Sequence, residues 1–290
     1  MQAGKSATWS RPLLTVISNK MYVCKTLITV GKEFASREKR LSICLRANGF
    51  SFAEATTAGQ LITFGDVEGA HGGSMTDMMG GLKVLFASVG IRPLGYASSE
   101  LILLSDENVW VPDELYTASA NRKYLKFVGA EPAEVMSCQC KALKSTMVFS
   151  ADEQRVTAFK VAIPGIVVKN QHVKMATLAS RSAGHPVVFT HWREGRVDIA
   201  ACRDGRYLYG NTFRFASIDE ALYHIVDVMK SYSLEDGATE LLMCGEVDRG
   251  LYAQFRPYFP QVSLFNGNID LSSTPEFKKI QPYRHALILM

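Results

Sequence analysis

The residues that could perform chemistry in this 290-residue chain are histidines, cysteines, carboxylates and glycines, and few of them have the spacing of a known site. His185, His191 and His224 match no zinc-binding spacing. Cys138 and Cys140 lie two positions apart, without a second cysteine or histidine pair at zinc-finger distance. The sequence therefore predicts no metal site, and we expect reduced cysteines and a cytoplasmic protein.

Nucleophilic catalysis finds no support in the sequence either. Residues 71–73, His-Gly-Gly, could form an oxyanion-type loop, but no G-x-S-x-G motif accompanies them, so we interpret them as an ordinary loop. Met75, Met78 and Met79 could line an adaptable partner groove. Their spacing is more simply explained by the buried face of a helix.

The hydrophobic pattern of the first half predicts the elements that would position these residues. Residues 40–56 alternate apolar and polar side chains around Asn48-Gly49, which indicates a hairpin with strands at about 41–46 and 50–56. Residues 57–73 predict a loop, and the apolar spacing that follows predicts a helix. The remaining expected elements are strands "LILLS" and "VWVP", a helix from Asp113, an antiparallel pair "TMVFSAD" and "RVTAFKVAIP", and a helix over about 166–181.

The second half predicts a sheet of its own. Turns at Glu194-Gly195 and Asp204-Gly205 divide a meander of three strands, and "SIDE" at 217–220 is a capping box that begins a helix. The apolar strand "TELLMCG", the helix "RGLYAQFRPYF" and the strand "QVSLF" follow. The order βββαβαβ is the signature of a ribonuclease-H-like unit, and two such units in tandem form the actin-like ATPase architecture.

Several stretches resemble an uncharacterised family of Bacteroidota proteins described as having an actin-like ATPase fold: "LSICLRANGFSF", "KYLKFVG" and "YLYGNTFRFASIDEALYHIVDVM…ELLMCGEV…LYAQFRPYFPQV". The likeness covers about residues 40–290 and is most specific in "GNTFRF…DEALYHI". It implies a bacterial α/β protein with two ribonuclease-H-like lobes and no assigned activity. We expect a basic N-terminal extension at 1–39, lobe one at 40–183, and lobe two with a C-terminal tail at 184–290.

An actin-like ATPase holds Mg-ATP between its lobes, with an acidic residue on the first strand of each lobe. The corresponding strands here, Leu41–Arg46 and Val187–Trp192, contain no carboxylate. The positions that would hold the acids carry Ser42 and, in lobe two, Thr190 or His191. Both hairpin turns are also too short to wrap phosphates with backbone N–H groups. We therefore expect no catalytic residue and no ATP hydrolysis.

Gly245-Glu246 follow the strand "ELLMC", where the adenosine-binding loop of this fold usually carries two glycines. Only the first glycine matches, and the simplest explanation is that Gly245 permits a tight strand-to-helix turn. Under a nucleotide-binding alternative, Gly245 and Glu246 are the candidate binding residues, with ATP and Mg²⁺ as cofactors. Asp198, Asp66 or Asp77 could then supply acidity from displaced positions, although their spacing lends this no support.

The distribution of charge along the chain helps to decide between a protein, a nucleic acid and a membrane as the partner. The net charge is +4, but residues 1–40 contain eight basic and two acidic residues, a balance of +6 that leaves −2 for the rest of the chain. Four aromatic residues alternate along one strand: Tyr207, Tyr209, Phe213 and Phe215. They could stack on single-stranded nucleic acid, but packing beneath the following helix explains them more simply. No apolar run reaches the roughly 18 residues of a membrane span. We expect a protein partner, no nucleic acid and no integral membrane segment.

Three functions stay open on the sequence alone. A non-catalytic binding or scaffolding protein, a pseudoenzyme with a degenerate actin-like ATPase fold, is favoured because the phosphate-site acids are missing. The first alternative is a nucleotide-binding ATPase or kinase-like enzyme with displaced acidic residues. The second is a membrane-proximal adaptor that touches anionic lipid through the basic residues near the N-terminus.

Overall fold

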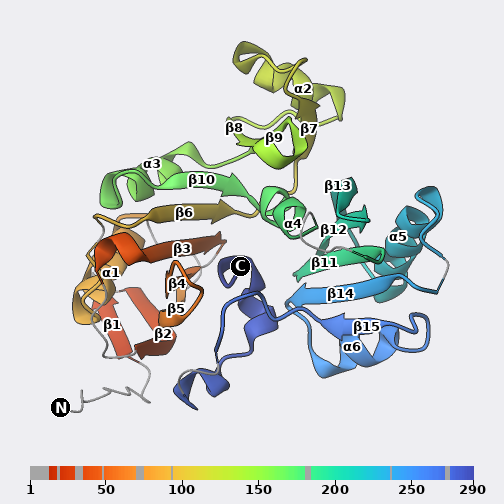
Figure 1. The fold of residues 1–290 in the computed structure, drawn as a ribbon. Coiled ribbons are helices and arrows are strands. Elements are labelled where there is room, and N and C mark those ends of the chain that lie inside the picture. Colours follow the sequence, from red (N-terminus) through yellow and green to blue (C-terminus); the bar gives the residue numbers. More distant parts are fainter. Residues whose placement is uncertain are drawn as a thin grey trace.

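The structure is a computed structural model. It describes the chain except residues 1–12, 18–19, 30–34, 48, 70–74, 93, 180–183, 236 and 272–274. Two sheets lie side by side, and a smaller three-stranded sheet projects above the gap between them (Figure 1). Among the described residues, no helix has the length and apolar character needed to cross a membrane.

The seven-stranded first sheet has the order β1-β2-β5-β4-β3-β6-β10. Its strands are β1 (Leu13–Ile17), β2 (Lys20–Thr29), β3 (Lys39–Arg46), β4 (Gly49–Thr56), β5 (Leu61–Gly69), β6 (Ser98–Leu103) and β10 (Val167–Asn170). β3 pairs antiparallel with β4 and parallel with β6, so the predicted hairpin is confirmed, while Asn48 of its turn lies outside the described residues. Helices α1 (Met75–Ser88) and α3 (Glu153–Ala162) share an apolar core with one face of this sheet.

The five-stranded second sheet has the order β13-β12-β11-β14-β15. Its elements are β11 (Val187–Arg193), β12 (Arg196–Arg203), β13 (Arg206–Arg214), α5 (Ile218–Ser231), β14 (Glu240–Gly245), α6 (Arg249–Phe255) and β15 (Val262–Leu264). The βββαβαβ order is therefore confirmed, and both sheets contain a core with the same strand order. The capping box is present as well: the Ser217 hydroxyl accepts a hydrogen bond from the Glu220 N–H, and the Glu220 carboxylate accepts one from the Ala216 N–H.

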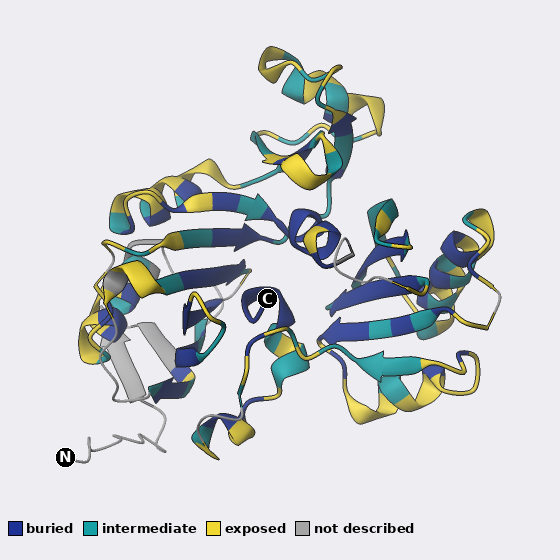
Figure 2. Cartoon of the chain, viewed as in Figure 1, coloured by how far each residue is buried: buried dark blue, intermediate teal, exposed yellow. Residues whose placement is uncertain are grey.

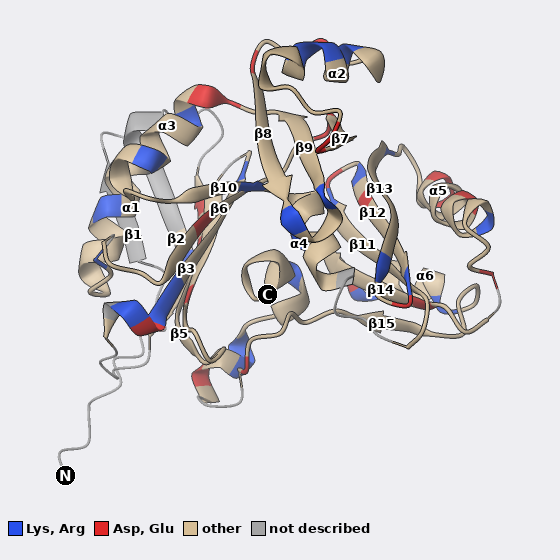
Figure 3. Cartoon of the chain, turned by 45° about the horizontal axis from the view of Figure 1, so that its top comes forward, with Lys and Arg blue, Asp and Glu red and all other residues tan. Residues whose placement is uncertain are grey.

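The projecting sheet is an insertion between β6 and α3. It contains β7 (Asn108–Pro112), α2 (Asn121–Phe127), β8 (Val135–Cys140) and β9 (Ser145–Ser150), with β9 in the centre. Its fully buried core is small, consisting of Val111, Leu125 and Val148. Lys and Arg residues gather on α2 at the tip of the insertion (Figure 3).

Four expectations in the first half differ from the structure. Residues 61–69, expected within a loop, form β5. Residues 153–162 form α3 rather than a strand paired with "TMVFSAD", because the Asp152 carboxylate caps the helix and accepts a hydrogen bond from the Arg155 N–H at 2.9 Å. The helix expected over 166–181 is preceded by the edge strand β10, and only Gln171–Ala179 form helix α4. The helix expected from Asp113 begins at Asn121, because residues 113–115 form a turn.

The aromatic residues of β13 do not all share one face. The register between β12 and β13 shifts near Cys202, leaving Leu208 as an extra residue, and this bulge turns Tyr207 away from Tyr209. Phe213 stacks on His224 of α5 with ring centroids 4.5 Å apart. Tyr207 instead accepts a hydrogen bond from the Trp110 indole N–H at 3.2 Å.

A shared hydrophobic core joins the two sheets. It contains Cys44 and Phe64 from the first sheet and Phe189 from the second. The C-terminal residues 287–290 are buried in the same core (Figure 2), and the 3₁₀ segment Pro282–Ile288 contacts β3, β4 and β14. This packing fixes how the two sheets face each other and thereby shapes the space between them.

Candidate functional site

A cleft of about 970 Å³ opens between the two sheets, near the base of the insertion. The ends of β3 and β6 line it from the first sheet, and the ends of β11 and β14 line it from the second. Within each sheet these strands run parallel, so their carboxyl ends meet at one edge. The β3–β4 turn (the first hairpin) and the β11–β12 turn (the second hairpin) therefore both border the cleft. An actin-like ATPase uses this position for nucleotide.

Arg193 at the tip of the second hairpin connects the two sides of the cleft. Its guanidinium donates to both carboxylate oxygens of Asp198, at 2.9 and 3.1 Å, and to Asp106 at 3.1 Å. Asp106 lies in the loop after β6, so this bond joins the second sheet to the first. Arg196 donates to the same aspartate at 2.5 Å. The centre of the cleft thus contains a continuous network of ion pairs between protein groups.

Asp198 is fully buried at the inner end of this network. Besides Arg193, it accepts hydrogen bonds from His191 at 2.9 Å, Thr212 at 2.7 Å and Gln171 at 3.2 Å. Burial by itself would raise the pKa of the carboxyl, but the Arg193 charge and the His191 hydrogen bond outweigh it and hold the pKa well below its usual range. The carboxylate is ionised with its acceptor sites occupied, so it has little capacity left for Mg²⁺ or water.

Helix α4 supplies polar groups that support this network from the first-sheet side. Gln171 donates to the Ser105 carbonyl oxygen at 2.6 Å, and His172 lies 2.9 Å from the Thr212 hydroxyl. Both side chains are fully buried. Burial lowers the pKa of His172 to about 4 although the Asp198 charge opposes the shift, so this imidazole is neutral at pH 7.

The first hairpin ends in Arg46, which pairs within its own sheet. Its guanidinium donates to Asp66 at 2.6 Å and to the Val67 carbonyl oxygen at 3.3 Å. Arg155 of α3 donates to the carbonyl oxygens of Arg46 and Ala47, at 3.2 and 3.3 Å. The backbone of this turn is therefore held by an arginine, in contrast to the phosphate-binding hairpin of an ATPase.

The strand positions at which phosphate-site acids were expected hold engaged polar side chains. Ser42 donates to Glu100 at 2.8 Å, and Glu100 also pairs with Lys174 at 2.6 Å. Thr190 donates to the Leu242 carbonyl oxygen at 3.1 Å. His191, the third of these positions, binds Asp198 as described above. Asp66 is likewise engaged by Arg46, and the side chain of Asp77 lies outside the described residues.

Gly245 and Glu246 lie at the second-sheet side of the cleft. Gly245 has φ +86°, and a Cβ atom at this position would lie 2.3 Å from the Trp192 carbonyl oxygen. The Glu246 N–H donates to that same oxygen at 2.8 Å. Gly245 is thus required by the turn itself, and its assignment to nucleotide binding stays a prediction. The exposed side chain of Glu246 lines the cleft.

The described residues contain no group of three or more His, Cys, Asp or Glu side chains that could hold a metal ion. His185 lies 3.2 Å from Glu240, away from His224 on α5. Cys138 and Cys140 are free thiols, like the other four cysteines. His71 and the side chains of Met75 and Met78 lie outside the described residues.

Sequence reasoning missed Asp106, Arg193 and Arg196 as the residues that define the cleft. One signal was available: Asp198 stands in the otherwise apolar run "VDIAAC". A carboxylate in a buried strand needs a cationic partner, and Arg193, Arg196 and Arg203 all lie within five positions of Asp198. The partnership with Asp106, 87 residues away from Arg193, leaves no local signal.

Comparison with solved structures identifies proteins of similar fold. A crystal structure of a Bacteroides thetaiotaomicron protein, described as having an actin-like ATPase fold and unknown function, matches with a TM-score of 0.64 and 17% identity, over 81% of this chain and 94% of that chain. The PilM-PilN type IV pilus biogenesis complex matches with a TM-score of 0.57 and 11% identity, over 87% of this chain and 97% of that chain. At these identities the likeness shows the fold alone.

The predicted actin-like ATPase fold with two mixed sheets is thereby confirmed. A comparison of the sequence with curated proteins finds no match. Residues 32–262, most of the chain, match the family described as "Protein of unknown function (DUF3822)", and the chain belongs to this family.

Proposed function

We propose that the protein is a non-catalytic binding or scaffolding protein in which ion pairs between protein groups occupy the catalytic centre of an actin-like fold. The observation that carries the proposal is the position of Arg193. Its guanidinium contacts Asp198 on one side and Asp106 on the other, across the cleft in which Mg-ATP would have to bind.

The chemistry of phosphoryl transfer supports this proposal. Catalysis depends on carboxylates that position Mg²⁺ and the attacking water. Here Asp106 and Asp198 are each bound by arginine, and the fully buried Asp198 accepts five hydrogen bonds. Freeing it for a metal ion would leave Arg193 with Asp106 alone and remove its fully buried counter-ion, which is unfavourable in a buried environment.

The fold comparison supports a protein as the partner. The PilM-PilN structure contains a protein of this fold in a protein complex, so the architecture can serve protein recruitment. We infer a protein partner and a cytoplasmic setting. The thiols fit a reducing environment, because all six are free and burial raises the pKa of Cys44 to about 12. The lobe boundary at residue 184 remains part of the proposal, whereas β1 and β2, which were expected in an N-terminal extension at 1–39, lie in the first sheet, so lobe one begins before residue 40.

Mg-ATP binding and turnover test the proposal. With roughly 5 mM Mg-ATP we expect no phosphate release above that of buffer alone. We also expect no change in the melting temperature in thermal-shift measurements. A ligand at one hundred times its Kd would raise the melting temperature of a chain of this size by roughly 5 °C. A shift of that size together with steady phosphate release would contradict the proposal and favour the nucleotide-binding alternative. A catalytically competent actin-like ATPase serves as the positive control.

A further inference from the structure

The arginines that line the cleft are already engaged by the protein. Arg46 binds Asp66, Arg155 binds two carbonyl oxygens of the first hairpin, and Arg193 and Arg196 bind Asp106. Arg214 is the most loosely held, with its guanidinium 3.7 Å from Asp106 and 71% of the side chain exposed. Four of the five arginines are therefore close to carboxylates, and Arg155 is held by backbone carbonyl oxygens, so an anionic ligand would have to compete with these contacts.

The carboxylates of the cleft divide into engaged and open groups. Seven line the cleft: Glu68, Asp106, Glu107, Glu134, Asp152, Glu194 and Glu246. Glu68 pairs with Lys25, while Glu134 and Asp152 accept hydrogen bonds from backbone N–H groups at the start of α3. Within the described part of the chain, the side chains of Glu107, Glu194 and Glu246 have no hydrogen bond or salt bridge. Among the described residues, these three carboxylates outnumber Arg155, the one lining arginine that pairs with no carboxylate, so the uncompensated charge of the cleft is negative.

A recess beside the cleft shows the shape of the group that these carboxylates could receive. It has a volume of about 360 Å³, and Arg193, Glu194 and Glu246 lie at its junction with the cleft, because all three line both cavities. Arg193 is paired with Asp106 and Asp198, so the unpaired charges at the junction are the two carboxylates. Its apolar lining comes from Trp192, Phe215, Ile218 and Leu251. An apolar recess with carboxylates at its mouth fits a long methylene chain that ends in a cation. Lys and Arg side chains have this form.

We propose that the cleft binds a basic peptide segment of a partner protein, with a Lys or Arg side chain lying across the recess and its cationic head between Glu194 and Glu246. This inference rests on the proposed binding function and names the chemistry of the partner. A nucleoside triphosphate would fit this cleft poorly, because its negative charge would be repelled by the unpaired carboxylates. Complementary charge of this kind governs which partner associates.

The test measures fluorescence anisotropy of the full chain with a fluorescein-labelled peptide of three Gly-Ser-Lys-Leu repeats. Its twin peptide carries Glu in place of Lys. At about 50 mM salt, where surface charges are weakly screened, we expect the Lys peptide to bind and the Glu peptide not to bind. The double variant Glu194→Gln/Glu246→Gln should weaken binding of the Lys peptide about tenfold, the effect of losing two exposed ion pairs.

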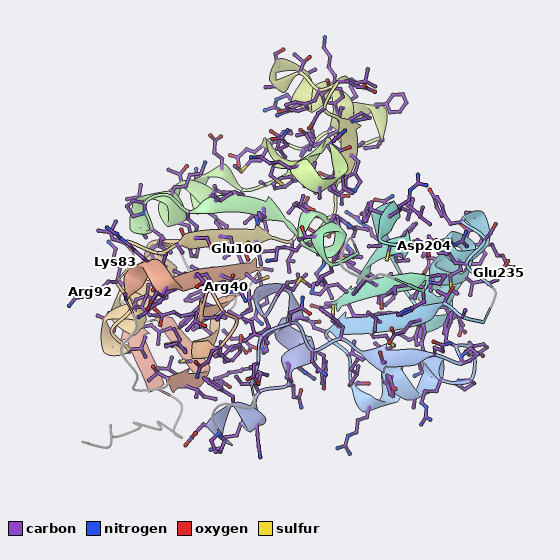
Figure 4. All side chains as sticks on the ribbon, viewed as in Figure 1. Arg40, Lys83, Arg92, Glu100, Asp204 and Glu235 are labelled. Carbon is purple, nitrogen blue, oxygen red and sulfur yellow. The ribbon has the colours of Figure 1, made fainter. Side chains whose placement is uncertain are left out.

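The matched control is the double variant Asp204→Asn/Glu235→Gln, which also removes two carboxylates. Figure 4 shows both residues at the far end of the second sheet, away from the cleft. This control should bind the Lys peptide like the unaltered protein. Urea unfolding of both double variants confirms that each one is folded, as expected for exposed side chains.

Three results would overturn the inference: no binding of the Lys peptide, equal binding of both peptides, or the same loss of affinity in both double variants. The last result would mean that the peptide responds only to overall charge. These outcomes leave the proposed function standing. Steady phosphate release from Mg-ATP would instead overturn the proposed function, whatever the peptides do.

Discussion

The two hairpins that border the cleft have the same topology and carry arginine at corresponding ends, yet they are connected differently. Arg46 of the first hairpin binds Asp66 in its own sheet, and both side chains keep some exposure, 27% and 13%. Arg193 of the second hairpin binds the fully buried Asp198 and also reaches Asp106 beyond the cleft. One arginine stabilises its own sheet locally, whereas the other holds the two sheets together.

The difference teaches that a shared strand order does not determine what an equivalent residue does. The dielectric environment and the partner decide its contribution. A partly exposed pair contributes little to stability, while removing one member of a buried network leaves uncompensated charge. The second hairpin should therefore be much more sensitive to loss of its carboxylate than the first.

The largest expected effect comes from Asp198→Ala. It leaves Arg193, His191 and Thr212 without their common acceptor, and we expect the free energy of unfolding to fall by about 4 kcal/mol. The matched change at the partner of the first hairpin, Asp66→Ala in β5, should cost about 1 kcal/mol. Urea unfolding followed by circular dichroism measures both. Equal losses would show that the two hairpins do not differ in the way described.

Acid should destabilise the surroundings of the second hairpin through His172. Its pKa is about 4 when folded, below the ordinary 6.5, so the unfolded chain binds the proton more strongly. Stability is therefore lost as the pH falls from 6.5 towards 4, by on the order of 3 kcal/mol. Urea midpoints between pH 7 and 4 should show this slope, and His172→Gln should reduce it. His285, whose pKa burial also lowers to about 4, should maintain a remaining slope in that variant.

For the glycines of the two turns we expect the opposite order, with the first hairpin more sensitive to substitution than the second. A Cβ atom on Gly49 of the first hairpin would lie 2.1 Å from the Val67 carbonyl oxygen. Gly195 of the second hairpin has φ +60°, and its nearest atom would be 3.7 Å away. We expect Gly49→Ala to cost about 2 to 3 kcal/mol through the steric clash, and Gly195→Ala about 1 kcal/mol through backbone strain. Differential scanning calorimetry compares the two, and a larger loss at Gly195 would contradict this explanation.

The smallest effect is expected from Asp106→Asn, which weakens only the connection across the cleft. The carboxylate is 26% exposed, so the loss of stability should be about 1 kcal/mol. Hydrogen exchange is the sharper measurement, because amides in residues 104–107 and 193–196 should exchange faster while those of the first hairpin do not change. Uniform exchange in both hairpins would show that the network does not couple the sheets.

The parts of the fold that the sequence predicts correctly depend on local signals. The hairpin expected around residues 47–49 and the capping box at Ser217 both rest on signals that act over a few residues of the chain. The strand order of the second sheet follows from such elements and their lengths. Where the local signal was ambiguous, the prediction failed. The stretch "RVTAFKVAIP" shows an alternating pattern typical of a strand, but its buried residues Val156 and Phe159 are three positions apart on the inner face of helix α3.

The candidate site was less predictable because its connections are long-range. Glu246 lines the cleft, and its position after a buried strand, next to Gly245, was the signal that singled it out. Asp106 carries no recognisable signal in the sequence, since its role depends on the insertion and the second hairpin meeting in space. The bulge at Leu208 is likewise a property of strand pairing, so the face of Tyr207 could not be read from alternation.

That bulge has an optical consequence. Because Tyr207 turns towards the insertion, Trp110 is held there through its indole N–H, with its ring 5.7 Å from the tyrosine ring. Trp192 lies instead deep in the second sheet's core, 5.3 Å from Phe255. The emission of Trp110, isolated by replacing Trp9 and Trp192 with phenylalanine, therefore reports on the joint between the insertion and the second sheet without an added dye.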